Sequence, residues 1–444
     1  MCTSRSRRGR RREREDREGR RSHTARTAGT VRLVRTVTIV GASLSGVYAA
    51  RELRAQGFDG RLVIVGEEPH RPYDRPPLSK DFLTGKADEE QLALTDAEET
   101  AELDAEWLLG VRARGLDARG RTVLLGDGRT VSTDGVVIAT GASARHLPGD
   151  ALTGVHTLRT LDDARALRDE LADGPRRVVV IGGGFIGAET ASSCAALGHD
   201  VTVVEAAPLP LVPQLGREMA AVCATLHRRG GAALVTGTGV ARLHGGAGAG
   251  AGGVTGATGV TGVSGVTGVE LSDGRLLPAD TVIVGIGATP NTGWLSGSTL
   301  GLHDGVLCDD GCATGLPQVV AVGDVARVGG RRVEHWTSAT EQPRVAVRNL
   351  LAGRTVEPVR SVPYFWSDQY GARIQFAGRR NDGDTVRVTE GALAEGGPAE
   401  GGFLAVYERD GRTTAVLSVD RPRPFMRARR ALMRTASEVE PAVP

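Results

Sequence analysis

Cysteine is scarce in this chain of 444 residues, and its distribution excludes a fold built on disulfides. The five cysteines form an odd set that is spread from Cys2 to Cys312. A secreted disulfide scaffold carries an even, closely spaced set. Residues 36–193 contain no cysteine at all, so any redox chemistry in this part of the chain works without a thiol.

Long apolar runs are also missing. No run of about 18 apolar residues occurs, so no membrane span is predicted. The N-terminus is basic and lacks the apolar core of a signal peptide, which favours a cytoplasmic protein.

The first 34 residues have no aromatic side chain and no apolar periodicity before Val31. Residues 1–35 carry a net charge of +9, whereas the rest of the chain carries −7. We predict a disordered Arg-rich tail over 1–34, or translated sequence upstream of the true start. The alternative, an arm that binds nucleic acid, is less favoured because the body behind the tail is acidic.

Lysine is almost absent. Only Lys80 and Lys86 occur, against 53 arginines. Where arginine has replaced lysine so generally, a retained lysine indicates that a compact ammonium group is needed. Lys80 is therefore a candidate functional residue, with chance retention as the alternative.

The strongest pattern in the chain runs over residues 178–205, VVVIGGGFIGAETASSCAALGHDVTVVE. An apolar strand at 178–181 is followed by a G-x-G-x-x-G turn, a helix and a second strand at 201–204. The three glycines are Gly182, Gly184 and Gly187. This arrangement predicts a dinucleotide-binding unit, in which the helix N-terminus receives a diphosphate.

Glu205 ends the second strand of this unit. A carboxylate there accepts hydrogen bonds from the two hydroxyls of an adenosine ribose and repels a 2′-phosphate. We therefore expect NADH rather than NADPH.

A second unit of the same kind precedes it, with strands at 37–40 and 62–65. Its turn, GASLSG, places Ser43 where the middle glycine would be, between Gly41 and Gly46. A small hydroxyl residue still permits close approach of a phosphate, and Glu67 is the acid after the second strand.

Two dinucleotide units in one chain predict two dinucleotides. FAD in the first and NAD in the second make chemical sense, because a nicotinamide can pass a hydride to a flavin. Three later strands end in ATGAS (139–143), VIVGIGATPN (282–291) and VVAVGDVAR (319–327), and Asp324 lies in the last. This order predicts an α/β protein whose NAD domain is inserted into its FAD domain.

Residues 245–269 are a glycine-rich, low-complexity tract without proline, which excludes a collagen helix. We predict an enlarged, flexible hairpin loop with no catalytic role. A helix follows Asp324, after a loop that carries Trp336. Beyond it, strands are predicted at 373–377, 386–389, 403–407 and 413–419. The basic run 421–430 is either a docking edge for an acidic electron carrier or a solvated amphipathic helix.

Five stretches together resemble the single-FAD ferredoxin reductases of oxygenase systems, the putidaredoxin, rhodocoxin and biphenyl-dioxygenase reductase type. They are YDRPPLSK (73–80), VVIGGGFIGAE, VGIGATPN, AVGD and FWSDQY (365–370). The resemblance covers residues 36–424 and implies a glutathione-reductase-like fold. It divides the chain into an FAD-binding domain (35–156 and 286–357), an NAD-binding domain (157–285) and a C-terminal reductase domain (358–444).

The resemblance also implies the site. In the family the lysine matching Lys80 lies by the flavin and pairs with the glutamate matching Glu189, so these two are the expected catalytic pair. The expected FAD contacts are Gly41, Ser43, Ser45, Gly46, Glu67, Arg75, Lys80, Ala113, Ala139, Thr140, Gly141, Arg145, Asp324 and Trp336. The expected NAD contacts are Gly182, Gly184, Ile186, Gly187, Glu205 and Gly287. No metal site is expected.

The absence of early cysteines separates branches of this fold. Disulfide reductases need a cysteine pair soon after the first dinucleotide unit, and peroxidase-type members need one cysteine there. Cys308 and Cys312 lie too late in the chain for that role. We therefore expect an NADH:ferredoxin oxidoreductase that delivers single electrons to a small iron–sulfur ferredoxin serving a haem monooxygenase or a ring-hydroxylating dioxygenase.

Two alternatives remain open at this stage. One is a relative that reduces rubredoxin, monodehydroascorbate or oxygen. The other is an NADH-responsive redox flavoprotein of the apoptosis-inducing type, in which the Arg-rich tail binds nucleic acid.

Overall fold

The computed structural model describes residues 34–119, 121–148, 152–246, 265–394 and 397–438. The chain divides into two compact units, Met1–Val34 and Arg35–Pro444, and the second is described below. Most of the predicted Arg-rich tail and the middle of the glycine tract, 247–264, lie outside the described residues. Among the helices that the structure describes, none is long and apolar enough to cross a membrane.

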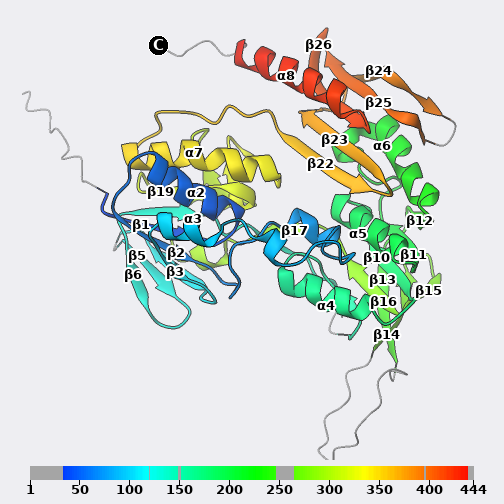
Figure 1. Ribbon diagram of the computed structural model, residues 1–444, viewed down its shortest axis with the longest axis horizontal. Coiled ribbons are helices and arrows are strands. Elements are labelled where there is room, and N and C mark those ends of the chain that lie inside the picture. The colour runs from blue at the N-terminus through cyan, green and yellow to red at the C-terminus, as the bar shows by residue number, and fades with distance from the viewer. Residues whose placement is uncertain (1–33, 120, 149–151, 247–264, 395–396, 439–444) are drawn as a thin grey trace, which may run out of the picture. The chain divides into compact units, whose positions relative to one another are not determined.

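The first dinucleotide unit belongs to a five-stranded parallel sheet in the order β19-β7-β1-β2-β3 (Figure 1). Its strands are β1 (Thr36–Val40), β2 (Arg61–Val65), β3 (Ala105–Leu108), β7 (Gly135–Ile138) and β19 (Val319–Ala321). β1, β2 and β7 are buried along almost their whole length, as expected of parallel strands covered on both faces. Helix α2 (Leu44–Ala55) follows β1 and packs against α7 (Trp336–Ala352).

The second dinucleotide unit forms another five-stranded parallel sheet, in the order β12-β11-β10-β16-β9. Its strands are β9 (Val155–His156), β10 (Arg177–Ile181), β11 (Asp200–Glu205), β12 (Ala233–Thr236) and β16 (Thr281–Val284). Helix α5 (Phe185–Ala196) joins β10 to β11, and α4 (Leu161–Leu171) precedes β10 behind a capping box of Thr160 and Asp163. The chain thus leaves the first sheet after β7, completes the second, and returns at β19. β9 joins the second sheet although the predicted boundary leaves it in the FAD domain.

The described ends of the glycine tract form strands, where a loop was predicted. β13 (Val240–Gly246) and β14 (Gly265–Leu271) pair in antiparallel fashion up to Gly246 and Gly265. Both ends of the tract are therefore strand, because Val266 and Val269 are buried in the core against β16. β15 (Leu276–Pro278) completes this three-stranded sheet.

Three small sheets and five short helical segments complete the dinucleotide units. The sheets are β4 (Ala113–Asp117) with β5 (Thr122–Leu125) and β6 (Thr130–Ser132), β8 (Ala142–Ala144) with β17 (Ala288–Pro290), and β18 (Val306–Cys308) with β20 (Ala326–Val328) and β21 (Arg331–Arg332). The helical segments are η1 (Pro76–Ser79), η2 (Glu90–Leu92), α3 (Ala97–Glu102), η3 (Gly293–Leu295) and η4 (Gly323–Val325).

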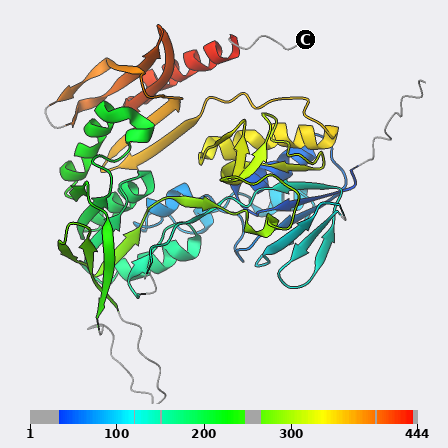
Figure 2. The same ribbon diagram turned by 180° about the vertical axis from the view of Figure 1, so that it is seen from behind.

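The C-terminal part is a five-stranded antiparallel sheet in the order β22-β23-β26-β25-β24. Its strands are β22 (Tyr364–Gln369), β23 (Ala372–Gly378), β24 (Thr385–Ala394), β25 (Gly397–Arg409) and β26 (Arg412–Val419). Helices α6 (Val212–Arg229) and α8 (Pro422–Glu438) lie on this sheet, as Figures 1 and 2 show. Leu215 and Cys223 of α6 share one core with Phe403, whereas Phe425 of α8 shares another with Leu404. α6 belongs to the second dinucleotide unit, so the C-terminal sheet packs against that unit.

The four strands predicted in this part are present, but β22 was missed. Its buried positions include Ser367 and Gln369 rather than apolar residues, so the usual alternation of apolar and polar side chains is lost. The reason for these buried polar groups lies in the site.

Candidate functional site

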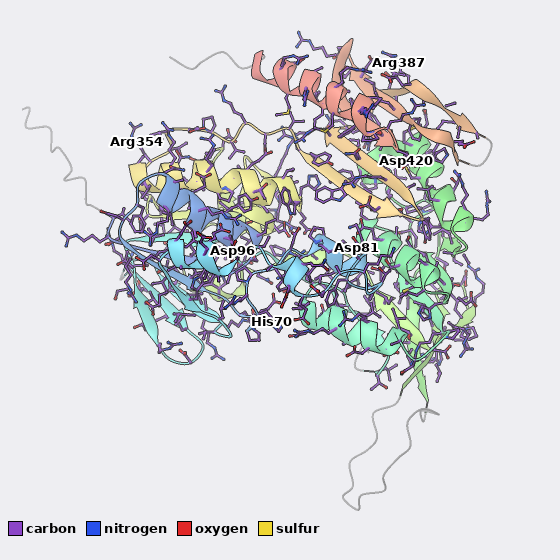
Figure 3. The ribbon with its side chains drawn as sticks, in the orientation of Figure 1. His70, Asp81, Asp96, Arg354, Arg387 and Asp420 are labelled. Atoms are coloured by element: carbon purple, nitrogen blue, oxygen red, sulfur yellow. The ribbon has the colours of Figure 1, made fainter. Side chains whose placement is uncertain are left out.

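A cavity of about 830 Å³ is bounded by both glycine turns. Its wall also includes the 73–80 segment, the loop after β16, the beginning of α7, and Phe365 and Trp366 of β22. Segments far apart in the chain therefore meet at one place. Figure 3 labels Asp81, the residue directly after Lys80, at the end of the 73–80 segment.

Two helices begin at this cavity without a side-chain cap. The N-cap residues are Ser43 for α2 and Gly184 for α5, and neither N-cap side chain accepts a hydrogen bond from the first turn. Both N-caps line the cavity. The unpaired N–H groups and positive dipole end of each helix are suited to a phosphate group.

Gly184 shows how closely a ligand can approach. A Cβ atom at Gly184 would meet no protein atom within 4 Å, although the residue belongs to the cavity wall. The space in front of the α5 N-terminus is therefore open. Together with the two uncapped helices, this open approach fits two dinucleotides, one at each turn.

A buried carboxylate lies at the meeting point of three segments. Glu189 of α5 is only 3% exposed and accepts four hydrogen bonds. Its Oε2 receives Ser79 Oγ and Lys80 Nζ, each at 2.7 Å, and its Oε1 receives Ser367 Oγ at 2.7 Å. The backbone N–H of Asp368 adds a fourth bond to Oε1 at 3.2 Å. The two predicted catalytic residues thus form an ion pair in the cavity wall.

The ammonium group of Lys80 is held from two directions. Besides Glu189, Nζ donates to the carbonyl oxygen of Pro76 at 3.0 Å. Only 17% of the Lys80 side chain is exposed. A charge of this kind is retained in a partly buried place because its partners compensate the lost hydration.

Arginines and Asp324 form another part of the wall. Arg159 Nη2 lies 2.8 Å from Asp324 Oδ2, and Arg159 Nε donates to the carbonyl oxygen of Ala142 at 2.9 Å. Arg75 is paired with Glu68 at 2.6 Å, and Arg145 Nε donates to the Ala288 carbonyl oxygen at 3.2 Å. The guanidinium groups are therefore fixed before any ligand binds.

Trp336 is the first residue of α7, not part of the loop before that helix as predicted. Its indole N–H donates to Asp74 Oδ1 at 3.1 Å, which secures the ring at the cavity wall. Burial raises the pKa of Asp74, and the hydrogen bond from Trp336 opposes that rise. The ring also meets Trp366 edge-on, with ring centres 6.0 Å apart.

The other predicted contacts divide by position. Those in the cavity wall are Ser45, Ala139, Gly141, Ile186, Gly187 and Gly287. Gly41, Gly46 and Gly182 shape the turns behind it, and Thr140 donates to the Asn291 carbonyl oxygen.

Three predicted contacts lie away from the cavity wall. Ala113 begins β4 inside the apolar core. Glu67 is largely exposed, with Arg112 at 3.6 Å. Glu205 ends β11 and accepts hydrogen bonds from the N–H groups of Gly183, at 2.9 Å, and Ala207, at 2.8 Å. The roles predicted for all these residues remain predictions.

The cysteines that the structure describes are free, and none lines the cavity. Cys308 belongs to β18, where burial raises the pKa of its thiol to about 12. Burial also raises the pKa of Cys312. Such thiols stay protonated and unreactive. Within the described ranges no cluster of His, Cys, Asp and Glu is suited to a metal ion.

Sequence reasoning missed three residues of the site. Ser79 and Ser367 lie within the stretches YDRPPLSK and FWSDQY, which marked their regions but not their bonds to Glu189. Arg159 lies in no motif, so only the fold places it beside Asp324.

The fold contains two parallel sheets of the dinucleotide-binding type, a cavity that both share, and a C-terminal antiparallel sheet. This combination defines a flavoprotein reductase with two dinucleotide sites. Residues 35–343 match the family described as pyridine nucleotide-disulphide oxidoreductase, and residues 364–443 match the one described as reductase C-terminal. The chain belongs to the pyridine nucleotide-disulphide oxidoreductase family. The predicted fold class and the predicted FAD and NAD cofactors are confirmed.

Relatives of similar length support this placement. The ferredoxin reductase component of chlorobenzene dioxygenase from Cupriavidus sp. strain PS12 is 38% identical over 413 residues, covering 91% of this chain and 94% of the relative. Rhodocoxin reductase from Rhodococcus erythropolis is 34% identical, with 89% of each chain covered. The crystal structure of the covalent putidaredoxin reductase–putidaredoxin complex matches with a TM-score of 0.79 and 32% identity, covering 91% of this chain and 94% of that one. The predicted resemblance is confirmed.

Proposed function

We propose that this chain is the reductase component of an oxygenase system, which passes electrons from NADH through FAD to a small iron–sulfur ferredoxin. One observation carries the proposal: the two uncapped helix N-termini and the Lys80–Glu189 pair share one cavity, and no described thiol lines it. The relatives include the reductase components named for chlorobenzene and benzene dioxygenases and a ferredoxin reductase for the CYP199A2 system.

The two dinucleotides would be held at different turns. The α2 N-terminus with Ser43 and Ser45, together with Arg145, Asp324 and Trp336, would hold FAD. The α5 N-terminus with Gly184 and Ile186 would hold NADH. When bound, FAD accepts the electron pair of a hydride and releases electrons one at a time.

The protein residues contribute position and charge rather than acid–base catalysis. All four bonds to Glu189 come from donors, so a proton on this carboxylate would displace one of them. Glu189 is therefore unsuited to be a general base. Lys80 offers a fixed positive charge in the wall, which favours negative charge on the group beside it.

We propose NADH as the preferred coenzyme because Glu205 is fixed at the second glycine turn. Its carboxylate is held by Gly183 and Ala207 at the end of β11. Such a carboxylate would accept ribose hydroxyls and repel the additional phosphate of NADPH.

The basic run near the C-terminus forms helix α8, and we propose its exposed face as part of the ferredoxin docking surface. Phe425 and Leu432 are buried in the fold, while Arg423, Arg427 and Arg434 are exposed. The exposed Met426 and Met433 supply apolar contact area on the helix. An acidic carrier would find here a basic patch on an otherwise acidic body.

We further propose a cytoplasmic location. The cysteines described by the structure are all free thiols, which is typical of proteins in a reducing compartment.

The test is anaerobic. The purified protein should show a flavin spectrum that NADH bleaches rapidly and NADPH slowly, and an added ferredoxin should then be reduced. Raising the ionic strength should slow ferredoxin reduction without slowing flavin bleaching, because only the docking step relies on exposed charges. A bound flavin that NADH reduces only very slowly would overturn the proposal and favour the redox-responsive alternative.

A further inference from the structure

The C-terminal sheet contributes a hydrogen-bond chain to the buried carboxylate of the cavity. Ser367 Oγ lies 2.7 Å from Glu189 Oε1, and Gln369 Nε2 lies 2.9 Å from Ser367 Oγ. All three side chains are buried, with exposures of 0% for Ser367, 1% for Gln369 and 3% for Glu189. Polar groups buried this completely persist only where each one is paired.

The direction of this chain follows from the chemistry of its members. An amide nitrogen donates and cannot accept, so Gln369 Nε2 donates a hydrogen bond to Ser367 Oγ. The single hydroxyl hydrogen of Ser367 is then free to point at Glu189, which as a carboxylate only accepts. The chain therefore runs Gln369 to Ser367 to Glu189.

The Gln369–Ser367 hydrogen-bond chain reaches the carboxylate oxygen of Glu189 that Lys80 does not contact. Ser79 and Lys80 bind Oε2, whereas Ser367 and the backbone N–H of Asp368 bind Oε1. β22 is itself fixed along its length by pairing with β23, and Tyr370 N donates to Ser192 Oγ of α5 at 2.7 Å. The strand is thus attached to the helix that carries Glu189.

We propose that Ser367, supported by Gln369, is the positioning residue that keeps Glu189 beside Lys80. Without it, Oε1 keeps only the longer backbone bond of 3.2 Å, and the carboxylate can turn away from the ammonium group. The inference deepens the proposed function, since it rests on the charge that the Lys80–Glu189 pair presents to the cavity. It makes the C-terminal sheet part of the cofactor site as well as a scaffold beside it.

The test uses the FAD-loaded protein and the variant Ser367→Ala. A lost hydrogen bond to a buried carboxylate corresponds to roughly tenfold in an equilibrium or rate constant. We expect about that fall in the rate of flavin bleaching at saturating NADH, and a similar displacement of the flavin's redox equilibrium against a reference dye. The Kd for NADH should change less than about twofold, because the NADH contacts are intact.

A matched control is Ser418→Ala. Ser418 is also a buried serine of this sheet, but its hydroxyl oxygen accepts from the backbone N–H of Arg421, whereas Ser367 is bonded to Glu189. Its loss should leave the dye equilibrium unchanged. If both variants shift that equilibrium equally, the effect is general loosening of the sheet and the proposal fails.

A double-mutant cycle separates this proposal from the proposed function. Ser367→Ala should have little further effect in a Glu189→Gln background, because the two residues act as one unit. Equal effects in both backgrounds would overturn the inference while wild-type ferredoxin reduction still stands. Should Ser367→Ala fail to fold, Gln369→Met removes the supporting donor instead, and an unchanged dye equilibrium in that variant would equally refute the chain.

Discussion

The two glycine turns of this chain share the close approach at their third glycine. They differ in how the acidic residue after the second strand is bonded. In the first turn a Cβ on Gly46 would lie 1.9 Å from the Gly41 carbonyl oxygen. In the second, a Cβ on Gly187 would lie 2.0 Å from the Gly182 carbonyl oxygen. Each turn therefore requires its third glycine for the same close approach of helix to strand. The close approach at the third glycine is the same in both turns.

The acidic residues after the two turns, Glu205 and Glu67, differ in their hydrogen bonds and exposure. Glu205 is the last residue of β11 and is bonded to Gly183 inside the turn. Glu67 follows β2 after Gly66 and is exposed to solvent near Arg112. The second turn thus holds its acid in a fixed place, whereas the acid after the first turn is exposed to solvent. If these acids recognise the ligands as proposed, the two sites differ beside the turns and not within them.

The largest effect is expected from adding a methyl group to the third glycine of either turn. Gly46→Ala should prevent FAD from binding, and Gly187→Ala should keep FAD but abolish bleaching by NADH. In each case the added atom overlaps a backbone oxygen, which cannot move without opening the turn. The flavin-to-protein ratio and anaerobic bleaching measure the two losses.

Circular dichroism of both variants is the control for folding. If Gly187→Ala loses FAD while its far-ultraviolet spectrum stays native, the two turns do not act separately. The assignment of one dinucleotide to each turn would then be wrong.

An intermediate effect is expected from reversing the charge of the acidic residue after each turn. Glu205→Arg should move the preference from NADH toward NADPH by about 10- to 100-fold in kcat/KM, because a repulsive charge becomes a partner for the 2′-phosphate. Glu67→Arg is the matched variant at the first turn. It should leave the NADH-to-NADPH ratio within about twofold, since an exposed charge contributes little.

Steady-state kinetics with both coenzymes decide this comparison. An unchanged preference in Glu205→Arg would contradict the role of the fixed carboxylate. A shift of similar size in Glu67→Arg would mean that the overall charge, not the position at the turn, sets the preference.

The sequence predicted the βαβ core of each sheet because that core rests on a local pattern, whereas the edge strands β3, β9 and β12 were not predicted. Apolar strands, glycine spacing and a terminal acid all lie within about 30 residues of one another, the span of a βαβ unit. Lys80 and Glu189 were paired by resemblance, since they are far apart in the chain. Ser367 was not predicted because a buried serine has no local sequence signal, and its burial depends on the bond to Glu189, which is far away in the chain. The strands at the ends of the glycine tract were not predicted for a related reason. Val266 lies in a strand because it packs into a core formed by residues far away in the chain.

The smallest effect is expected from exchanging the middle residues of the turns, with Ser43→Gly and Gly184→Ser. Both positions are helix N-caps in extended backbone, at φ −134° for Ser43 and φ −67° for Gly184, so either residue fits without strain. Glycine and serine are both accepted at N-caps, with a cost of a few tenths of a kcal/mol. Flavin content should stay near one per chain in both variants, and KM for NADH should rise less than about fivefold in Gly184→Ser. A larger rise would show that the NADH turn has no room for a hydroxymethyl group, although no protein atom lies within 4 Å of that Cβ position. The difference between the turns would then lie in how closely their ligands approach, and the acids alone would not explain it.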